Sequence, residues 1–149
     1  MTIYDPFFRT AQVLALLEPG PIVGRRRFQK IAYLAGLPAE WVYAERGPYA
    51  FDLDLTVVRL SDDGLIAVHP SPDGTVYRIE ARGRAFLRRL LADGIPIVIR
   101  QEIVTRYRDD DPDRLEYAAS VLFLVQQGMD ERSAIERIRI LQPHLGVIA

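Results

Sequence analysis

Residues 60–80 read LSDDGLIAVHPSPDGTVYRIE and contain the most specific structural signals of the chain. Residues 65–68 and 75–79 favour strands, and the Pro-Asp-Gly sequence at positions 72–74 is typical of the tight turn that would join them. Gly64 follows two aspartates and supplies the left-handed conformation that commonly ends a helix. The stretch therefore predicts the end of one helix followed by a β-hairpin.

Two further helices and a strand are expected before that helix. Asp5-Pro6 is typical of a capped helix start, and the EPGP sequence at residues 18–21 is expected to end this helix. The apolar residues at helical spacing within it are Phe7, Ala11, Leu14 and Leu17. A second helix is predicted from near Gly24 to Gly36. Residues 41–44 then favour a short strand that ends at Gly47-Pro48, with a single helical turn as the alternative.

The helix that leads into the hairpin is expected to begin near Ala50. Its predicted apolar residues are Phe51, Leu55 and Val58, flanked by Leu53, Val57 and Leu60. After the hairpin, residues 80–91 return to helical periodicity, with arginines between the apolar positions. The sequence thus predicts a helix on each side of the hairpin.

The remaining residues predict three more helices. Apolar residues recur every four positions at Ile95, Ile99, Ile103 and Tyr107 and favour a helix, although residues 97–99 are equally compatible with a strand. Asp111 can cap a helix that begins at Pro112 and ends at Gly128. Asp130 can cap a last helix that ends at Pro143.

Three helices with a strand among them, followed by a hairpin and another helix, form the element list of a winged helix-turn-helix domain. We therefore predict a mainly α fold with a small β wing. Residues 1–93 form the winged helix-turn-helix domain in this prediction, and residues 94–149 form a helical extension that packs on the same core. The extension is expected to pack on the first helix or to dimerise with a second chain, and we expect a homodimer.

Three short motifs carry a resemblance to a known family. They are GRRRFQKIAYLA at residues 24–35, Tyr43 with Gly47-Pro48-Tyr49, and LSDDGLI at residues 60–66. Over about residues 22–68 the chain resembles the YwgA-like family of uncharacterised prokaryotic proteins, and it is more weakly similar to Panacea-type antitoxin domains. The resemblance implies a winged-helix-like fold and no established substrate. The chain departs from the family pattern at Arg46 and at Ala50, where serine is usual.

Basic residues flank the predicted hairpin on both sides. Residues 24–46 carry a net charge of +3 and residues 78–89 a net charge of +4, whereas residues 50–63 carry −3. Cations neutralise the phosphates of DNA, so these two basic segments are candidate DNA contacts. The candidate nucleic-acid-binding residues are Arg25, Arg26, Arg27, Lys30, Arg46, Tyr49, Arg78, Arg82 and Arg84. Solvated arginines or ion pairs with the acidic helix are the alternative interpretation of the same residues.

Composition excludes several other classes of protein. The chain has 149 residues, 19 Lys+Arg against 20 Asp+Glu, 49% hydrophobic residues and no cysteine, which is typical of one globular domain without disulfides or thiolate chemistry.

Asp109, Asp111 and Asp113 mimic the start of a calcium loop, but Arg114 and Ser120 stand where that loop needs glycine and glutamate. We therefore expect no metal, no cofactor and no enzyme activity. Without a leader or a long apolar run, the sequence predicts a cytoplasmic protein with no membrane contact.

The sequence thus favours a DNA-binding winged-helix protein, either a transcription regulator or a related regulatory component, with double-stranded DNA as its partner. The alternative is a protein-interaction module, antitoxin-like or adaptor, that binds its partner through the Gly-Pro-Tyr turn and the acidic third helix. A net charge of −1 slightly favours the alternative, because many nucleic-acid-binding domains are basic overall.

Overall fold

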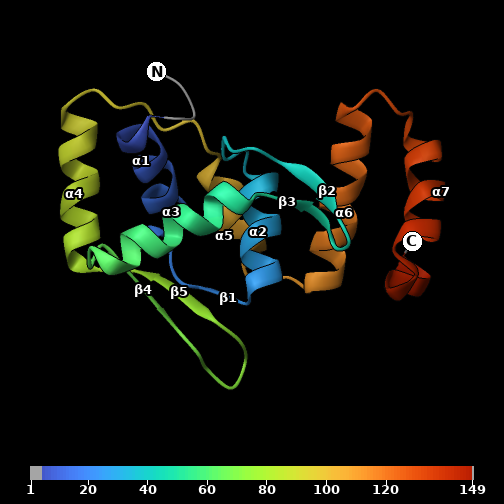
Figure 1. Cartoon of the computed structure of the whole chain (residues 1–149), viewed down its shortest axis with the longest axis horizontal. Helices are drawn as coiled ribbons and strands as arrows, with labels where there is room; N and C mark the ends of the chain where they lie inside the picture. The colour runs from blue at the N-terminus through green and yellow to red at the C-terminus, as the bar shows by residue number, and fades with distance from the viewer. Residues whose placement is uncertain (1–4, 149) are drawn as a thin grey trace.

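The computed structural model describes residues 5–148, which form a mainly helical fold, as predicted, with two small antiparallel sheets (Figure 1). The helices are α1 (Pro6–Leu17), α2 (Arg25–Leu34), α3 (Phe51–Asp62), α4 (Ala81–Ala92), α5 (Gln101–Tyr107), α6 (Pro112–Gln126) and α7 (Glu131–Leu141), followed by the short 3-10 helix η1 (Pro143–Ile148). The strands are β1 (Ile22–Val23), β2 (Val42–Ala44), β3 (Gly47–Tyr49), β4 (Ile66–His69) and β5 (Val76–Ile79).

Local capping chemistry begins α1 and α6 as the sequence predicts. The Asp5 side chain accepts hydrogen bonds from the backbone N–H groups of Phe7 and Phe8, and Asp111 accepts one from Asp113. Each cap is followed by a proline at the start of the helix, where its missing N–H costs nothing. Phe7 was expected on the apolar face of α1, but its side chain is exposed. Nearly all later residues of this helix are buried. The reason is that α3, α4, α5 and β5 all pack against α1.

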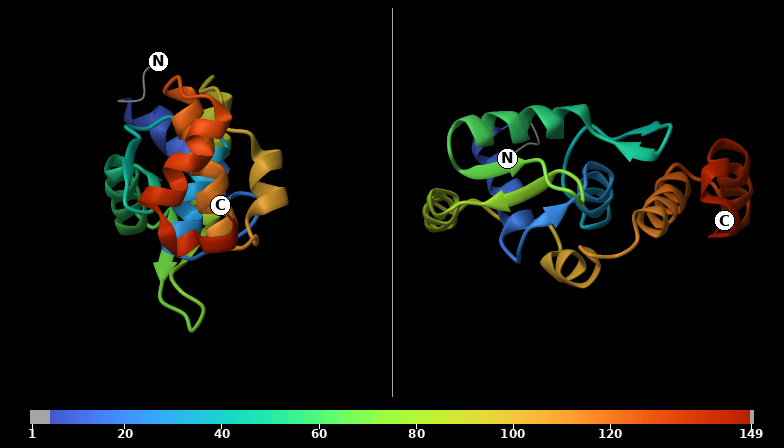
Figure 2. Two further views of the ribbon diagram at one scale, coloured as in Figure 1. Left: turned by 90° about the vertical axis from the view of Figure 1, so that its right-hand side faces the viewer. Right: turned by 90° about the horizontal axis from the view of Figure 1, so that it is seen from below.

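The predicted hairpin is confirmed as β4 and β5, and a third strand joins it. The sheet has the order β1-β5-β4, with Ile22 opposite Tyr77 and Ile66 opposite Ile79. With only two residues, β1 is too short to show a periodic pattern in the sequence. The hairpin projects beyond the helices in Figures 1 and 2.

The second sheet corrects the role predicted for Gly47-Pro48. The expected strand β2 is present, but these two residues do not end it, because they form β3, its antiparallel partner. Proline lacks an N–H and is tolerated in such a short edge strand. Tyr43 lies opposite Pro48 and Val42 opposite Tyr49 in this pair.

The orientation of α3 is a second correction. The predicted apolar residues Phe51, Leu55 and Val58 are 64%, 57% and 57% exposed. The residues of α3 that face the core are Leu53, Thr56, Val57 and Leu60. Both sides of this helix carry apolar residues, and packing against α1 and β4 selects the side that is buried.

Residues 95–100 form neither the predicted helix nor the alternative strand, because α5 begins only at Gln101. The Gln12 side chain donates to the Pro96 carbonyl and accepts from the Val98 N–H, at 2.7 and 2.9 Å. These side-chain bonds satisfy backbone groups that a helix would pair internally. Ile99 is still buried in the main core, which explains the helix-like apolar spacing.

Two apolar cores organise the molecule. The main core begins in α1 and continues through Val104 of α5 to Leu115 of α6, on both sides of the boundary predicted at residue 93. The second core contains Leu124, Ala134, Ile138 and Leu145 and joins α6, α7 and η1. Figure 1 shows α4 and α7 at opposite ends of the molecule, and α6 packs against α2 and β3. Within residues 5–148, no helix has the length and apolar character needed to cross a membrane.

Candidate functional site

The predicted basic residues of α2 point in different directions. Arg25 is exposed, Arg26 and Arg27 are half-buried, and Lys30 is only 2% exposed. This pattern follows from helical geometry, because Phe28, Ile31 and Ala32 face the core and the remaining positions are distributed around the helix. The four cations of this helix therefore do not form one exposed surface.

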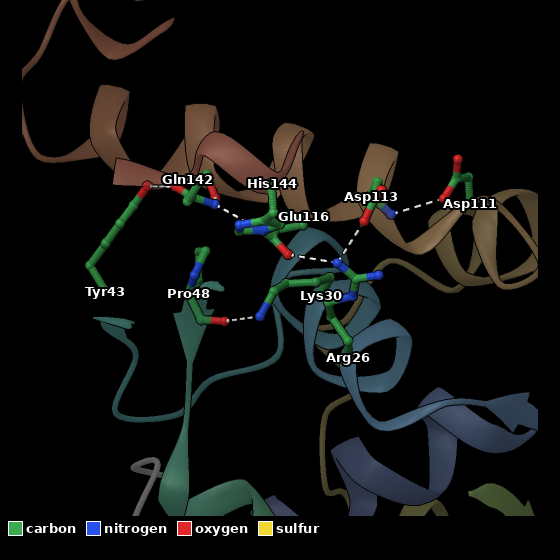
Figure 3. A network of polar contacts seen from close by, with 10 residues as sticks. Arg26, Lys30, Tyr43, Pro48, Asp111, Asp113, Glu116, Gln142 and His144 are labelled. Atoms are coloured by element: carbon green, nitrogen blue, oxygen red, sulfur yellow. Dashed lines mark hydrogen bonds and ion pairs between the residues drawn. The ribbon is translucent and has the colours of Figure 1, made fainter. Parts of the chain in front are cut away.

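Arg26 is part of a polar network around a buried carboxylate of α6 (Figure 3). Its Nη1 donates to Asp113 Oδ1 at 2.7 Å and to Glu116 Oε1 at 2.9 Å. Burial lowers the pKa of Arg26, but the hydrogen bonds to Glu116 and Asp113 outweigh this effect and raise it. Arg26 is therefore a charged residue that joins α2 to α6.

The segment after α7 completes the network. The Gln142 side chain donates to Glu116 Oε2 at 2.8 Å and to Ser120 Oγ at 3.0 Å, and the His144 ring contacts the same Glu116 oxygen. The Glu116 side chain has no exposed surface, so these contacts replace the water that a carboxylate requires. Tyr43 of β2 reaches Gln142 from the opposite side, so β2, α6 and the segment after α7 meet here.

Lys30 and Arg27 also have internal partners. Lys30 Nζ donates to the Pro48 carbonyl at 2.8 Å, and burial lowers the pKa of Lys30 to about 8. Arg27 donates to the carbonyls of Val23 and Asp110, at 2.6 and 2.9 Å. These two cations hold the strands and the α5–α6 connection against α2.

Five of the nine predicted residues meet around one cavity between α2, α3, β3 and the β4–β5 hairpin. This cavity has a volume of about 420 Å³. The predicted residues that line it are Arg25, Arg26, Lys30, Arg46 and Tyr49. The Tyr49 hydroxyl hydrogen-bonds to Asp54 of α3, and this bond raises the pKa of Tyr49 to about 12. Here the structure brings a basic helix, a tight turn and two tyrosines, Tyr49 and Tyr77, together.

The other predicted residues lie elsewhere. Arg27 does not line the cavity, and Arg78 is exposed on β5. Arg82 and Arg84 are exposed on α4, and Arg84 Nη1 donates to the Glu18 carbonyl at 3.3 Å. The nine residues thus do not converge on a single surface.

The outward side of α3 is a surface that the sequence prediction assigned to the core. Phe51, Leu55 and Val58 lie at positions i, i+4 and i+7, so they share one face of the helix. Asp62 and Asp63 are exposed at the C-terminal end of this helix. The result is an apolar stripe with acidic groups at one end, which we call the α3 stripe.

Sequence reasoning also missed Glu116, Ser120 and Gln142. Glu116 and Ser120 lie four residues apart, next to the apolar Leu115 and Ala119, on the buried side of α6. A glutamate on an apolar helix face is a signal for a buried partner, because an unpaired buried carboxylate is costly. The identity of that partner, Arg26, is not readable from the spacing.

Comparison with known proteins finds no family model, no curated protein and no solved structure that matches this chain. The resemblance to the YwgA-like family therefore stays a prediction.

Proposed function

We propose that the protein is a winged-helix-like protein-interaction module that binds a partner protein through the α3 stripe. The order α1, β1, α2, α3, β4, β5, with β2 and β3 inserted between α2 and α3, and the sheet order β1-β5-β4 support the winged-helix part of this proposal. In such a domain α3 takes the place of the helix that enters the major groove of DNA. The chemistry of its outward face therefore separates the two functions that the sequence favours.

The exposure of Phe51, Leu55 and Val58 is the observation that carries the proposal. A helix that binds DNA needs cations and polar groups on this face, because phosphates and base edges are its ligands. Apolar residues at i, i+4 and i+7 are instead typical of a helix that packs against another protein. Asp62 and Asp63 would repel phosphate, so the charge also favours a protein partner.

The same residues define the chemistry expected of the partner. An apolar stripe of three large side chains fits a complementary apolar patch, such as one face of an amphipathic helix. Because charges across an interface are usually complementary, the acidic C-terminal end of α3 predicts lysine or arginine at the corresponding end of that patch. Large apolar anchors near the centre of an interface supply most of its binding energy.

Site-specific cross-linking in the protein's own cells tests this proposal. A photoreactive residue placed at Leu55 should form an adduct with one protein, whereas the same residue at Leu91, which is 45% exposed on α4, should not. With the purified partner, Leu55→Asp should weaken binding at least about tenfold, and Leu91→Asp on α4 should leave it unchanged. Equal adducts at both positions, or equal effects of the two substitutions, would contradict the proposal.

DNA binding is the second candidate, and the exposure of Arg25, Arg46 and Arg78 favours it. None of the three forms an ion pair within the described part of the chain. If this function holds, mixed-sequence duplex DNA should bind at about 50 mM salt and lose affinity steeply at about 200 mM. Arg25→Ala with Arg46→Ala should weaken this binding, while Leu55→Asp should not.

We also propose a homodimer formed by the C-terminal helices. The α6–α7 pair leaves Val125, Ile140 and Leu141 exposed. Among the described elements, α7 makes substantial contact only with α6 and η1. Sedimentation of the wild type and of an Ile140→Asp variant tests this proposal, because a polar residue in an apolar interface should shift a dimer toward monomer.

A further inference from the structure

The cavity between α2 and the hairpin has one charged wall and one apolar wall. The charged wall comes from α2 and from Arg46 in the turn between β2 and β3. The apolar wall contains Val57 and Val58 of α3 and Val68 of β4. A cavity of about 420 Å³ lies within the range of roughly 300 to 1,000 Å³ that small-molecule sites occupy.

The positive charge of this cavity is only partly compensated. Arg26 is paired with Asp113 and Glu116, but Arg25 and Arg46 make no ion pair with any described residue. Lys30 also lines the cavity, but its ammonium group donates to the Pro48 carbonyl. Asp54 also lines the cavity, and its carboxylate accepts hydrogen bonds from Tyr49 and Gln29. An anion that enters the cavity would therefore meet cations with unused donors.

Arg25 lines the cavity together with both of its tyrosines. The hydrogen bond to Asp54 raises the pKa of Tyr49 and burial raises the pKa of Tyr77, and the charge of Arg25 opposes both effects. Tyr77 stacks on Phe28, with ring centroids 4.1 Å apart, so its position is fixed by the core. A guanidinium close to rigid aromatic rings is an arrangement that can bind an anionic group and the apolar body attached to it.

We propose that this cavity binds a small organic oxyanion. Its carboxylate or phosphate group faces Arg25 and Arg46, and its aromatic or aliphatic body packs against Val57, Val58 and Tyr77. This site goes beyond the proposed function, because it shares only Val58 with the α3 stripe, and Phe51 and Leu55 do not line the cavity. The valine wall favours a small organic anion over a DNA phosphate, since the DNA backbone has no apolar body to place against it.

Calorimetry on the full chain with three probes tests each part of the proposal. The probes are 1-naphthyl phosphate, inorganic phosphate, which lacks the apolar body, and 1-naphthol, which lacks the charge. We expect 1-naphthyl phosphate to bind at least about tenfold more tightly than either of the other two. Methyl resonances of Val57 and Val68 should shift on binding, while those of Val98 and Val125, which lie outside the cavity, should not.

A double substitution of the two uncompensated arginines provides the decisive comparison. Arg25→Ala with Arg46→Ala should weaken 1-naphthyl phosphate binding at least about tenfold, because charge-assisted hydrogen bonds are lost. Arg84→Ala with Arg88→Ala is the matched control, since both arginines are exposed on α4 and lie outside the cavity, and it should bind like the wild type. Thermal unfolding at an unchanged temperature would show that both double variants fold.

Three results would overturn the proposal. They are no binding of any probe by the folded wild type, equal binding by the two double variants, and equal affinity for 1-naphthol and 1-naphthyl phosphate. Binding of duplex DNA to the same variants tests whether the phosphate that the cavity recognises belongs to a nucleic acid instead of a small molecule. If duplex binding depends on Arg25 and Arg46 while no small probe binds, the cavity belongs to a nucleic-acid surface and the proposal fails.

Discussion

Arg26 and Glu116, 90 residues apart in the sequence, form the ion pair that joins α2 to α6, with Arg26 Nη1 2.9 Å from Glu116 Oε1. The Glu116 side chain has no exposed surface, whereas the Arg26 side chain is 30% exposed. Removing a carboxylate from water is costly, and this pair repays the cost only because Gln142 and His144 also contact the carboxylate. The predicted DNA contact at Arg26 thus has an alternative role as a positioning residue of the fold.

Arg26→Met should destabilise the protein, because it leaves the buried Glu116 carboxylate without its main cation. Loss of one partner of a fully buried pair costs about 3–5 kcal/mol. The partial exposure of Arg26 places the expected loss near the lower end of that range, or somewhat below it. Urea unfolding followed by circular dichroism measures this difference.

Arg89→Met is the matched control, because Arg89 pairs with Asp93 on the exposed surface of α4. Its pair has an N–O distance of 3.6 Å and both side chains are more than half exposed, so we expect a loss below about 1 kcal/mol. Similar losses for the two variants would show that the Arg26 pair is no more than a surface contact.

Gly47 allows β3 to lie close to α6, and a methyl group there should push the two apart. A Cβ atom at Gly47 would lie 2.4 Å from Ser120 Oγ, and its φ of +92° already disfavours other residues. Gly94 has almost the same φ, +90°, with no atom within 4 Å of its Cβ position. Gly94→Ala should therefore cost only the backbone strain of about 1–2 kcal/mol.

Gly47→Ala should cost that strain and a further 1–3 kcal/mol or so from overpacking. Ser120→Ala should recover part of the additional loss when combined with Gly47→Ala, because it removes the oxygen that the methyl group meets. Equal unfolding free energies for the two glycine variants would show that β3 and α6 are free to separate at no cost.

The elements that could be predicted from the sequence are those fixed by neighbouring residues. Asp5 and Asp111 begin their helices through bonds to N–H groups two or three positions away, and Pro72-Asp73-Gly74 forms the turn between its own two strands. Such interactions are local, so a single sequence contains both partners within a few residues. The hairpin and most helix ends were therefore predictable.

The parts that could not be predicted depend on distant residues. Both Leu53 and Leu55 are apolar, and only the packing of α3 against α1 and β4 decides that Leu53 is buried. The partners of Arg26 and Lys30 lie in α6 and β3, far along the chain, and the charge count of α2 does not reveal them. The candidate site was thus predicted as a set of basic residues, but its cavity and its compensating acids were not.

Leu53 and Leu55 provide a direct test of which side of α3 is buried. Leu53→Ala should cost about 2–5 kcal/mol, because a fully buried side chain is replaced by a cavity. Leu55→Ala should change stability by no more than about 0.5 kcal/mol, since Leu55 is 57% exposed. Chemical unfolding of the two isomeric variants measures both values, and a larger loss for Leu55 would reverse the orientation described above.

Lys30 should make the stability of the protein depend on alkaline pH. Burial lowers the pKa of Lys30 from 10.5 to about 8, so between these values the unfolded chain binds a proton that the folded chain has released. Stability therefore rises with pH across this window, by at most about 3 kcal/mol. Burial raises the pKa of Tyr33 and Tyr43, which lowers stability above pH 10, but a Lys30→Met variant shares that effect. From pH 8 to 10.5 the unfolding free energy of the wild type should therefore rise relative to that of the variant. A constant difference between the two would mean that Lys30 titrates as an exposed lysine does.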